Sequence, residues 1–301
     1  MIFSSKNKND FGTDITPEEC KKIQLEILCY FRNMCDQHNI RYSLYAGTML
    51  GAVRHKGFIP WDDDIDILMP REDYETLRTH YALWNQREYM QLHDYKTDPL
   101  YEFPFMKLSD ERTVQLESRK KKREIGLHID IFPLDGIPGG TYLSWLHIQA
   151  CYFIKRCGLA ANRNPYRERE FSVSKKLVKA LFKMATLGTP PRFFCYLGEY
   201  LATRFTWHDS FYASNTIWMG PLVHGVHKER IPAKYYEQEG ELEFEGEHFH
   251  IIGIPHKILS IIYGDYMTPP PEHKRNSNVH VFGCWWKRGY VPEDSNERET
   301  P

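Results

Sequence analysis

Four aspartates lie within one short run of this chain, Trp61-Asp62-Asp63-Asp64-Ile65-Asp66-Ile67-Leu68-Met69. Asp64 and Asp66 are two residues apart and precede apolar residues, so on a strand both carboxylates would leave the same face while the isoleucines enter the core. Carboxylates this close repel one another, and a bound cation would relieve the repulsion. A hard cation such as Mg²⁺ takes oxygen ligands of this kind. The run therefore predicts a metal site, against the simpler interpretation of an acidic loop that caps the next helix.

The segment before the acidic run predicts a site for phosphate. Residues 40–45 have the pattern of a short strand, Ala46-Gly47-Thr48 that of a turn, and residues 49–55 that of a helix. Small side chains at such a turn let backbone N–H groups approach an anion at the start of the helix. A second turn then returns the chain to the acidic strand. We therefore expect the phosphate site and the metal site within one β-turn-α-turn-β unit.

These motifs carry a resemblance to a known family. The stretch Tyr42–Tyr74, from the Ala46-Gly47-Thr48 turn to Asp66, resembles the LicD family, bacterial phosphocholine transferases of the nucleotidyltransferase fold that are related to the fukutin proteins of animals. Further similar segments follow in the same order, around Asp130 and in residues 254–275, so the resemblance spans residues 16–285. Ala46 is a departure, because a second glycine is expected there.

The resemblance implies a third carboxylate on a later strand, and Asp130 fits this role. Alternation places Ile129 and Ile131 on one face of that strand and Asp130 on the other. Asp135 follows Pro133, so we expect it to shape a turn.

The expected site has two parts. Two Mg²⁺ ions would be held by the catalytic carboxylates Asp64, Asp66 and Asp130. The donor phosphates would be contacted by Gly47, Thr48, Arg54, Lys56 and Lys107. Arg54 and Lys56 follow the turn directly in the sequence, whereas Lys107 is implied by the family resemblance alone.

The resemblance implies a Mg²⁺-dependent phosphotransferase. It would move phosphocholine from CDP-choline to a hydroxyl of a cell-surface glycan, such as a teichoic acid, lipopolysaccharide or other polysaccharide precursor, and release CMP. Another CDP-linked phospho-alcohol would need the same carboxylates, and so would an NTP-dependent nucleotidyltransferase acting on a small molecule. An alternative of another class is a calcium-dependent glycan-binding module, which would also use carboxylates.

The expected fold class is α+β: a nucleotidyltransferase-like mixed β-sheet core flanked by helices, with a helical middle region. A capping box at Thr16-Pro17-Glu18-Glu19 predicts a helix that ends near Asn39, and a later helix is expected from Pro255 to Tyr263, with Gly264 ending it. The expected divisions are a flexible N-terminus at 1–15, a catalytic core at 16–138, a basic helical insertion at 139–215, the C-terminal part of the catalytic unit at 216–290, and a flexible tail at 291–301.

Charge and hydropathy bound the partners and the location. The net charge of −1 gives no general attraction to nucleic acid. The polar N-terminus and the lack of a long apolar run predict a cytoplasmic protein, and the seven cysteines are expected to be free thiols. Lys155–Arg192 carries ten basic residues against two glutamates. This segment suits peripheral contact with the inner face of the cytoplasmic membrane or a lipid-linked glycan acceptor, although a solvated helix face remains the alternative.

Overall fold

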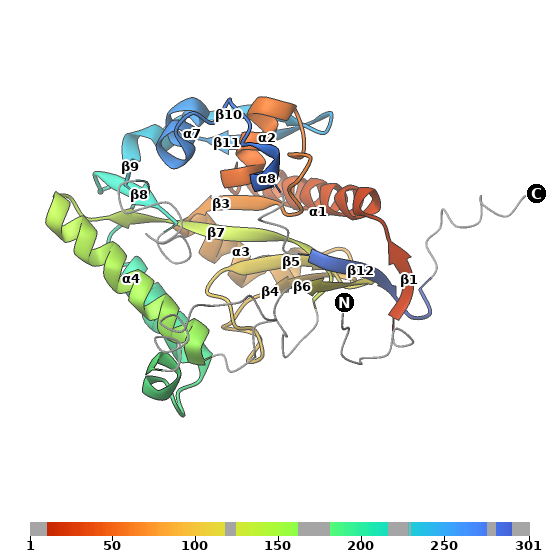
Figure 1. Cartoon of the computed structure of the whole chain (residues 1–301), viewed down its shortest axis with the longest axis horizontal. Helices are drawn as coiled ribbons and strands as arrows, with labels where there is room; N and C mark the ends of the chain where they lie inside the picture. Colours follow the sequence, from red (N-terminus) through yellow and green to blue (C-terminus); the bar gives the residue numbers. More distant parts are fainter. Residues whose placement is uncertain are drawn as a thin grey trace, which may run out of the picture.

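A computed structural model describes residues 11–117, 125–161, 181–215, 228, 230–275 and 281–290 (Figure 1). Its first half contains β1 (Phe11–Ile15), α1 (Pro17–His38), β2 (Ser43–Leu44), α2 (Ala46–His55), β3 (Asp66–Pro70), α3 (Arg71–Trp84), β4 (Met90–His93), β5 (Met106–Asp110), β6 (Thr113–Glu117) and β7 (Leu127–Ile137). Its second half contains α4 (Thr141–Ala161), α6 (Pro191–Ala202), β8 (Tyr212–Ser214), β9 (Ile231–Pro232), the 3₁₀ helix η3 (Ala233–Tyr236), β10 (Glu239–Phe244), β11 (Glu247–Ile252), α7 (Pro255–Tyr263), α8 (Glu272–Arg275) and β12 (Val281–Lys287).

The main sheet is mixed and has the strand order β2-β3-β7-β5-β4, with β8 paired to the end of β7 and β9 beyond it. β3 and β7 run parallel, whereas β2, β5 and β4 are antiparallel to their neighbours. A smaller sheet joins β1, β12 and β6, and β10 and β11 form a hairpin. The expected α+β fold, with a mixed sheet flanked by helices, is confirmed.

Side-chain alternation along the strands gives the main sheet two apolar faces. Ile67 and Ile131 belong to a core that includes residues of α1 and α3. Leu68 and Phe132, one residue further along each strand, belong to a second core that includes residues of α6 and α7. Asp66 and Asp130 have the parity of this second face, so the carboxylates lie on the side of the sheet that α7 covers.

The predicted bounds of α1 and α7 are confirmed. The Thr16 hydroxyl accepts a hydrogen bond from the Glu19 amide, and the Glu19 carboxylate accepts one from the Thr16 amide, which completes the capping box of α1. Asn39 ends α1 in the left-handed conformation, and Gly264 ends α7.

The N-terminal boundary differs from the prediction. Residues 11–15, expected in a flexible segment, form β1 and pair with β12, where Ile15 lies opposite Cys284. Their partner strand is some 270 residues away, so local sequence could not reveal the pairing. The division of the chain into a core and an insertion stays a prediction.

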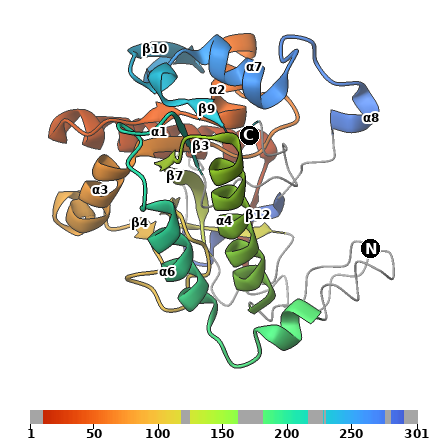
Figure 2. The same ribbon diagram turned by 90° about the vertical axis from the view of Figure 1, so that its left-hand side faces the viewer.

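The middle region is helical in its described parts. α4 and α6 lie side by side on the outside of the molecule (Figure 2). Residues 162–180, which hold much of the basic segment Lys155–Arg192, are outside the described residues, and so is 118–124. None of the described helices is both long and apolar enough to cross a membrane. All seven cysteines are free thiols, as expected.

Candidate active site

Two parallel strands bring the predicted carboxylates together. Asp66, the first residue of β3, lies directly opposite Asp130 in β7. The Asp130 amide donates to the Ile65 carbonyl at 2.8 Å, which fixes the register at this end. Two acids that are 64 positions apart in the sequence thus become cross-strand neighbours.

Asp64 lies in the loop before β3. The two-residue spacing had predicted a position on the strand, and this prediction was wrong. It nevertheless belongs to the site, because carboxylate oxygens of Asp62, Asp63 and Asp64 lie within 4.8 Å of one another. Among the described residues, these three aspartates are the group of potential ligand side chains whose geometry could hold a metal ion.

The charges of Asp66 on β3 and Asp130 on β7 also act on Asp64, so the strands contribute to this site. Burial and then the charge of Asp66 raise the pKa of Asp64 well above its ordinary value, with Asp62 and Asp130 adding to the effect. Burial and the charges of Asp130 and Asp62 likewise raise the pKa of Asp66. We call Asp62, Asp64, Asp66 and Asp130 the acidic cluster. Asp63 lies at the edge of this group, because its charge is the last-named influence on Asp64 and also acts on Cys20 of α1 and Cys284 of β12.

Lys107 brings one positive charge to the acidic cluster. It lies opposite Asp130 in β5, and its ammonium donates to the Asp130 carboxylate and lies 2.7 Å from Nε2 of His128. The Lys107 side chain is only 5% exposed, so the ion pair is shielded from solvent. His128 thus contacts Lys107, lies 3.6 Å from the Asp130 carboxylate, and was not expected in the site.

The donor set suits divalent cations. Lys107 pairs with Asp130, and among the described residues no Lys or Arg lies within ion-pair distance of the Asp64 or Asp66 carboxylate. Neighbouring carboxylate oxygens of this kind match the ligands that Mg²⁺ prefers. The two predicted Mg²⁺ ions remain a prediction.

The start of α2 lies beside the acidic cluster. The helix begins at Ala46, three residues earlier than expected, so Gly47 and Thr48 form its first turn. Amides in a first turn have no partner within the helix, and Tyr45 provides no side-chain cap. This N-terminus is therefore suited to bind phosphate.

Contacts tie the two parts of the site together. The Thr48 hydroxyl accepts a hydrogen bond from the Asp66 amide at 2.8 Å, so this side chain positions β3. A Cβ at Gly47 would lie 2.7 Å from Oδ2 of Asp62. Glycine at this position thus leaves room for a carboxylate of the cluster.

Ala46 occupies a strained backbone position. Its φ of 44° lies in the left-handed region that glycine adopts freely. The glycine expected from the family pattern would relieve this strain. Alanine in its place therefore costs backbone strain at the start of α2.

Arg54 and Lys56 lie at the other end of α2. Lys56 is about 13 Å from Gly47 by the rise of a helix, is exposed, and caps the helix with φ 60°. The Arg54 guanidinium donates to the Tyr266 carbonyl at 2.6 Å. The structure does not bring either side chain into contact with the acidic cluster, and their predicted phosphate contacts remain untested.

The family model of the LicD/FKTN/FKRP nucleotidyltransferase domain matches residues 39–190. The chain belongs to this family. LicD of Haemophilus influenzae, a lipopolysaccharide cholinephosphotransferase, is 28% identical over 272 residues, which cover 86% of this chain and 94% of the relative. The ribitol 5-phosphate transferase FKRP of human and of mouse is 38% identical over 58 residues, or 19% of this chain and 12% of FKRP.

Besides His128, two residues of this LicD-family site were not predicted. Asp62 acts electrostatically on both Asp64 and Asp66, and its place in the acidic run was the available signal. Tyr263 ends α7, and burial and then the charge of Asp66 raise its pKa, which places its hydroxyl near the cluster. No local pattern in the sequence pairs Tyr263 with residues nearly 200 positions earlier.

A second group of buried charges surrounds the other end of β7. Asp135, expected to shape a turn, lies instead in β7, which continues past Pro133 to pair with β8. Arg71 donates two hydrogen bonds to its carboxylate, at 2.8 and 2.6 Å. We call Arg71, Arg78, Asp94, Asp135 and Glu199 the ionic network.

Proposed function

We propose that this LicD-family phosphotransferase moves phosphocholine from CDP-choline to a hydroxyl of a cell-surface glycan precursor. One observation carries the proposal: the acidic cluster lies beside the uncapped N-terminus of α2, so a metal-binding and a phosphate-binding surface meet. The Haemophilus relative, which this chain matches over nearly its full length, is named for cholinephosphate transfer to lipopolysaccharide, and it supports the choice of donor and acceptor.

In the proposed reaction, the acceptor oxygen attacks the phosphorus that carries choline. The bond from this phosphorus to the bridging oxygen breaks, CMP leaves with that oxygen, and the acceptor hydroxyl loses its proton. Phosphoryl transfer of this type depends mainly on positioning and on neutralisation of phosphate charge. Mg²⁺ held by Asp62, Asp64, Asp66 and Asp130 would supply this neutralisation and would acidify the acceptor hydroxyl.

The protein groups have separate tasks. The amides at the start of α2 bind the diphosphate, with Gly47 keeping the approach open. Lys107 holds the Asp130 carboxylate in place and adds positive charge beside the phosphate that is transferred. Thr48 fixes the distance between the helix start and Asp66 through its hydrogen bond.

Other donors would use the same groups. The FKRP relatives are named for ribitol 5-phosphate transfer, so a CDP-linked polyol is the second candidate donor. An NTP-dependent nucleotidyltransferase and a calcium-dependent glycan-binding module remain alternatives. The phosphate-binding helix start argues against the glycan-binding module, which would not need it. The cytoplasmic location expected from the sequence stays a prediction.

A donor screen tests the proposal. Purified protein with lipopolysaccharide or teichoic acid precursor and Mg²⁺ should release CMP from CDP-choline faster than from CDP-ribitol, and should release no pyrophosphate from CTP. A chelator should stop the reaction, and Mg²⁺ should restore it. Pyrophosphate release from CTP without CMP release from any CDP-alcohol would favour the nucleotidyltransferase alternative.

Replacing Gly47 by Val tests the phosphate-binding surface separately. The added side chain would meet the Asp62 carboxylate and the approach to the helix amides, so calorimetry should show weaker binding of CDP-choline. Gly240→Val is a matched control, because a Cβ there meets only ordinary contacts at 3.6 Å in the β10–β11 hairpin. Unchanged donor affinity in Gly47→Val would mean that the diphosphate binds elsewhere.

A further inference from the structure

The exposed apolar side chains of this protein are concentrated in one region. Thirteen of the sixteen large apolar side chains that are exposed in the described part of the chain lie between Tyr142 and Phe211. This stretch contains α4 and α6, which form the outer layer on one side of the molecule (Figures 1 and 2). Apolar surface that is gathered in this way marks an interaction site.

α4 is apolar on two opposite faces. Ser144, Ile148 and Cys151 are buried and recur at helical spacing on its inner face. Tyr142, Leu146 and Phe153 recur at positions i, i+4 and i+11 on the opposite face, where they are 71%, 47% and 58% exposed. An ordinary surface helix would carry polar residues on that outer face.

α6 repeats the arrangement with aromatic residues. Cys195, Gly198 and Ala202 are buried, whereas Phe193, Tyr196 and Tyr200 follow one another at positions i, i+3 and i+7 and are exposed. We call Tyr142, Leu146, Phe153, Phe193, Tyr196 and Tyr200 the outer stripes.

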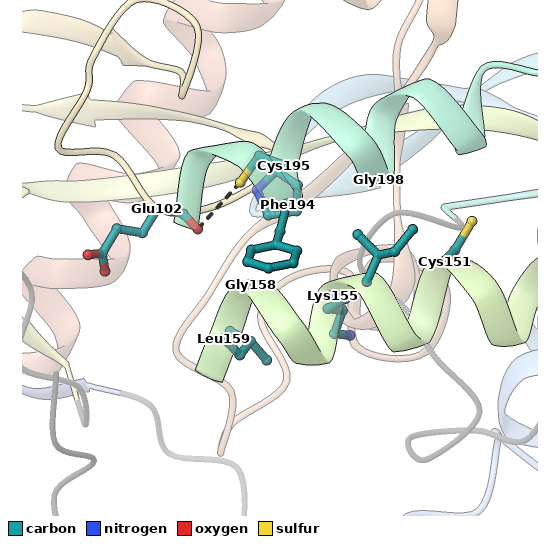
Figure 3. Close-up of a pocket in the computed structure, with 10 residues that line it drawn as sticks. Glu102, Cys151, Lys155, Gly158, Leu159, Phe194, Cys195 and Gly198 are labelled. Atoms are coloured by element: carbon teal, nitrogen blue, oxygen red, sulfur yellow. Dashed lines mark hydrogen bonds between the residues drawn. The ribbon is translucent and has the colours of Figure 1, made fainter. Parts of the chain in front are cut away.

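The inner faces of the two helices are already occupied by each other. Phe194 of α6 lies over Gly158 of α4, where a Cβ would come within 3.1 Å of the phenylalanine (Figure 3). Cys195 contacts the Glu102 carbonyl at 3.8 Å, which ties α6 to the loop before β5. The helix pair is thus docked on the core through one side. In the outer stripes, Phe153 meets the ring of Phe182 at 5.7 Å and Tyr196 meets that of Tyr95 at 5.1 Å, but both side chains remain exposed.

The charge around the outer stripes is positive. Residues 141–161 and 181–204 contain five basic residues, Lys155, Arg156, Lys183, Arg192 and Arg204, and one acidic residue, Glu199. Lys155 lines the pocket between the two helices, which leaves four basic residues for the outer side (Figure 3). Glu199 faces inward and is paired with Lys96 at 2.6 Å and Arg78 at 3.0 Å. The guanidinium of Arg204 lies 4.1 Å from the ring centre of Tyr200, so basic and aromatic groups adjoin at the edge of the stripe.

We infer that the outer stripes of α4 and α6 dock this protein on an anionic lipid bilayer. Tyrosine and tryptophan suit the boundary between headgroups and acyl chains, where one end of the side chain is apolar and the other is wet. Basic residues beside an apolar helix face add attraction to anionic headgroups. A second copy of the chain fits less well, because a two-fold contact would bring the same positive charges together. The inference is independent of the identity of the donor.

Vesicle flotation without nucleotide or glycan tests this surface. Wild-type protein should float with vesicles of equal parts phosphatidylcholine and phosphatidylglycerol, and less with phosphatidylcholine alone. Phe193→Ser/Tyr196→Ser/Tyr200→Ser should weaken binding to the mixed vesicles about tenfold or more, because three interfacial aromatic groups are lost. Leu83→Ser/Leu100→Ser is the matched control, because these exposed apolar residues lie outside the stripes, and it should bind as the wild type does.

A charge variant and the oligomeric state complete the experiment. Lys183→Glu should lower binding to the mixed vesicles most strongly at low salt and should leave the monomer folded by circular dichroism. The inference would be overturned if the wild type did not float with anionic vesicles, or if the triple variant bound them normally. A dimeric wild type that the triple variant converted to monomers would overturn it in favour of self-association.

Discussion

The two ends of the paired strands β3 and β7 carry buried charge of opposite character. In the ionic network, each acid has a basic partner. Arg71 binds Asp135 at 2.6 Å, and Arg78 lies 3.0 Å from Glu199 and 3.2 Å from Asp94. In the acidic cluster, Lys107 is paired with Asp130, and among the described residues no Lys or Arg lies within ion-pair distance of Asp64 or Asp66. Buried charges that balance one another need no ligand, whereas an unbalanced group is stable only with its protons retained or a cation bound. The ionic network is therefore expected to stabilise the fold, and the acidic cluster to bind a cation.

The largest effect is expected on transfer activity. Asp64→Asn, Asp66→Asn and Asp130→Asn should each lower the rate of phosphocholine transfer by a factor of about a thousand or more, because metal binding and charge neutralisation fail together. Circular dichroism should show an unchanged fold. Asp36→Asn, a change to an exposed carboxylate on α1, should retain activity. Near-normal turnover in a cluster variant would remove that residue from the site.

In the ionic network, the corresponding change should affect stability. Arg71→Ala leaves Asp135, whose side chain is 1% exposed, without its two hydrogen bonds, and should lower the free energy of unfolding by about 3–5 kcal/mol. Urea denaturation of the metal-free protein measures this loss. A loss below about 1 kcal/mol, the value of a surface ion pair, would show that the network is not a structural centre.

The sequence predicted these two centres unequally. The acidic run and the Gly47 turn were visible as motifs, because their residues are close along the chain, and the family resemblance supplied Asp130. The ionic network was not predicted, because Arg71 and Asp135 are 64 residues apart and Glu199 comes from another helix. Pro133 misled the interpretation of Asp135, since β7 tolerates the proline and continues past it.

The ends of α1 and α7 were predictable because capping is local, as at Thr16 and Gly264. Strand ends were not, because pairing is set by distant partners. Asp64 was therefore expected on a strand and lies before it, and residues 11–15 pair with a strand near the end of the chain.

The acidic cluster should also reveal itself through the pH dependence of stability. In the metal-free protein at neutral pH, Asp66→Asn should raise the free energy of unfolding by about 1–2 kcal/mol, because burial and like charges penalise the ionised carboxylate. Folding raises the pKa of Asp66 above its ordinary 3.8. The gain should thus be absent below pH 3.8, where this group is protonated in both states, and should grow as the pH rises toward the raised pKa.

Glu199 provides the control of opposite sign. Burial alone would raise its pKa, but Arg78, Lys96 and Tyr95 outweigh burial and lower the pKa to about 2. Its stabilisation is present above its ordinary 4.5 and is lost as the pH falls toward 2. Glu199→Gln should therefore be less stable than the wild type at neutral pH, with the difference shrinking in acid. The same sign for both variants would contradict the comparison.

The smallest effect is expected from the strained residue at the start of α2. Ala46→Gly should stabilise the protein by up to about 1 kcal/mol, because glycine adopts a φ of 44° without strain, although the unfolded chain gains entropy. Thermal denaturation at matched pH measures the change. A clear loss of stability would show that the Ala46 methyl group, buried in the second core, contributes more by packing than its backbone costs.

The central claim is that the acidic cluster binds a divalent cation, and anomalous diffraction from crystals soaked in Mn²⁺ and CDP-choline tests it most directly. We predict an anomalous peak between the carboxylates of Asp64 and Asp66, about 2.1 Å from their oxygens, with the donor diphosphate between the ion and the start of α2. The peak should be absent from Asp66→Asn crystals and present in Arg71→Ala crystals. Saturating Mn²⁺ with no peak at the cluster, or a peak only at the ionic network, would contradict the account.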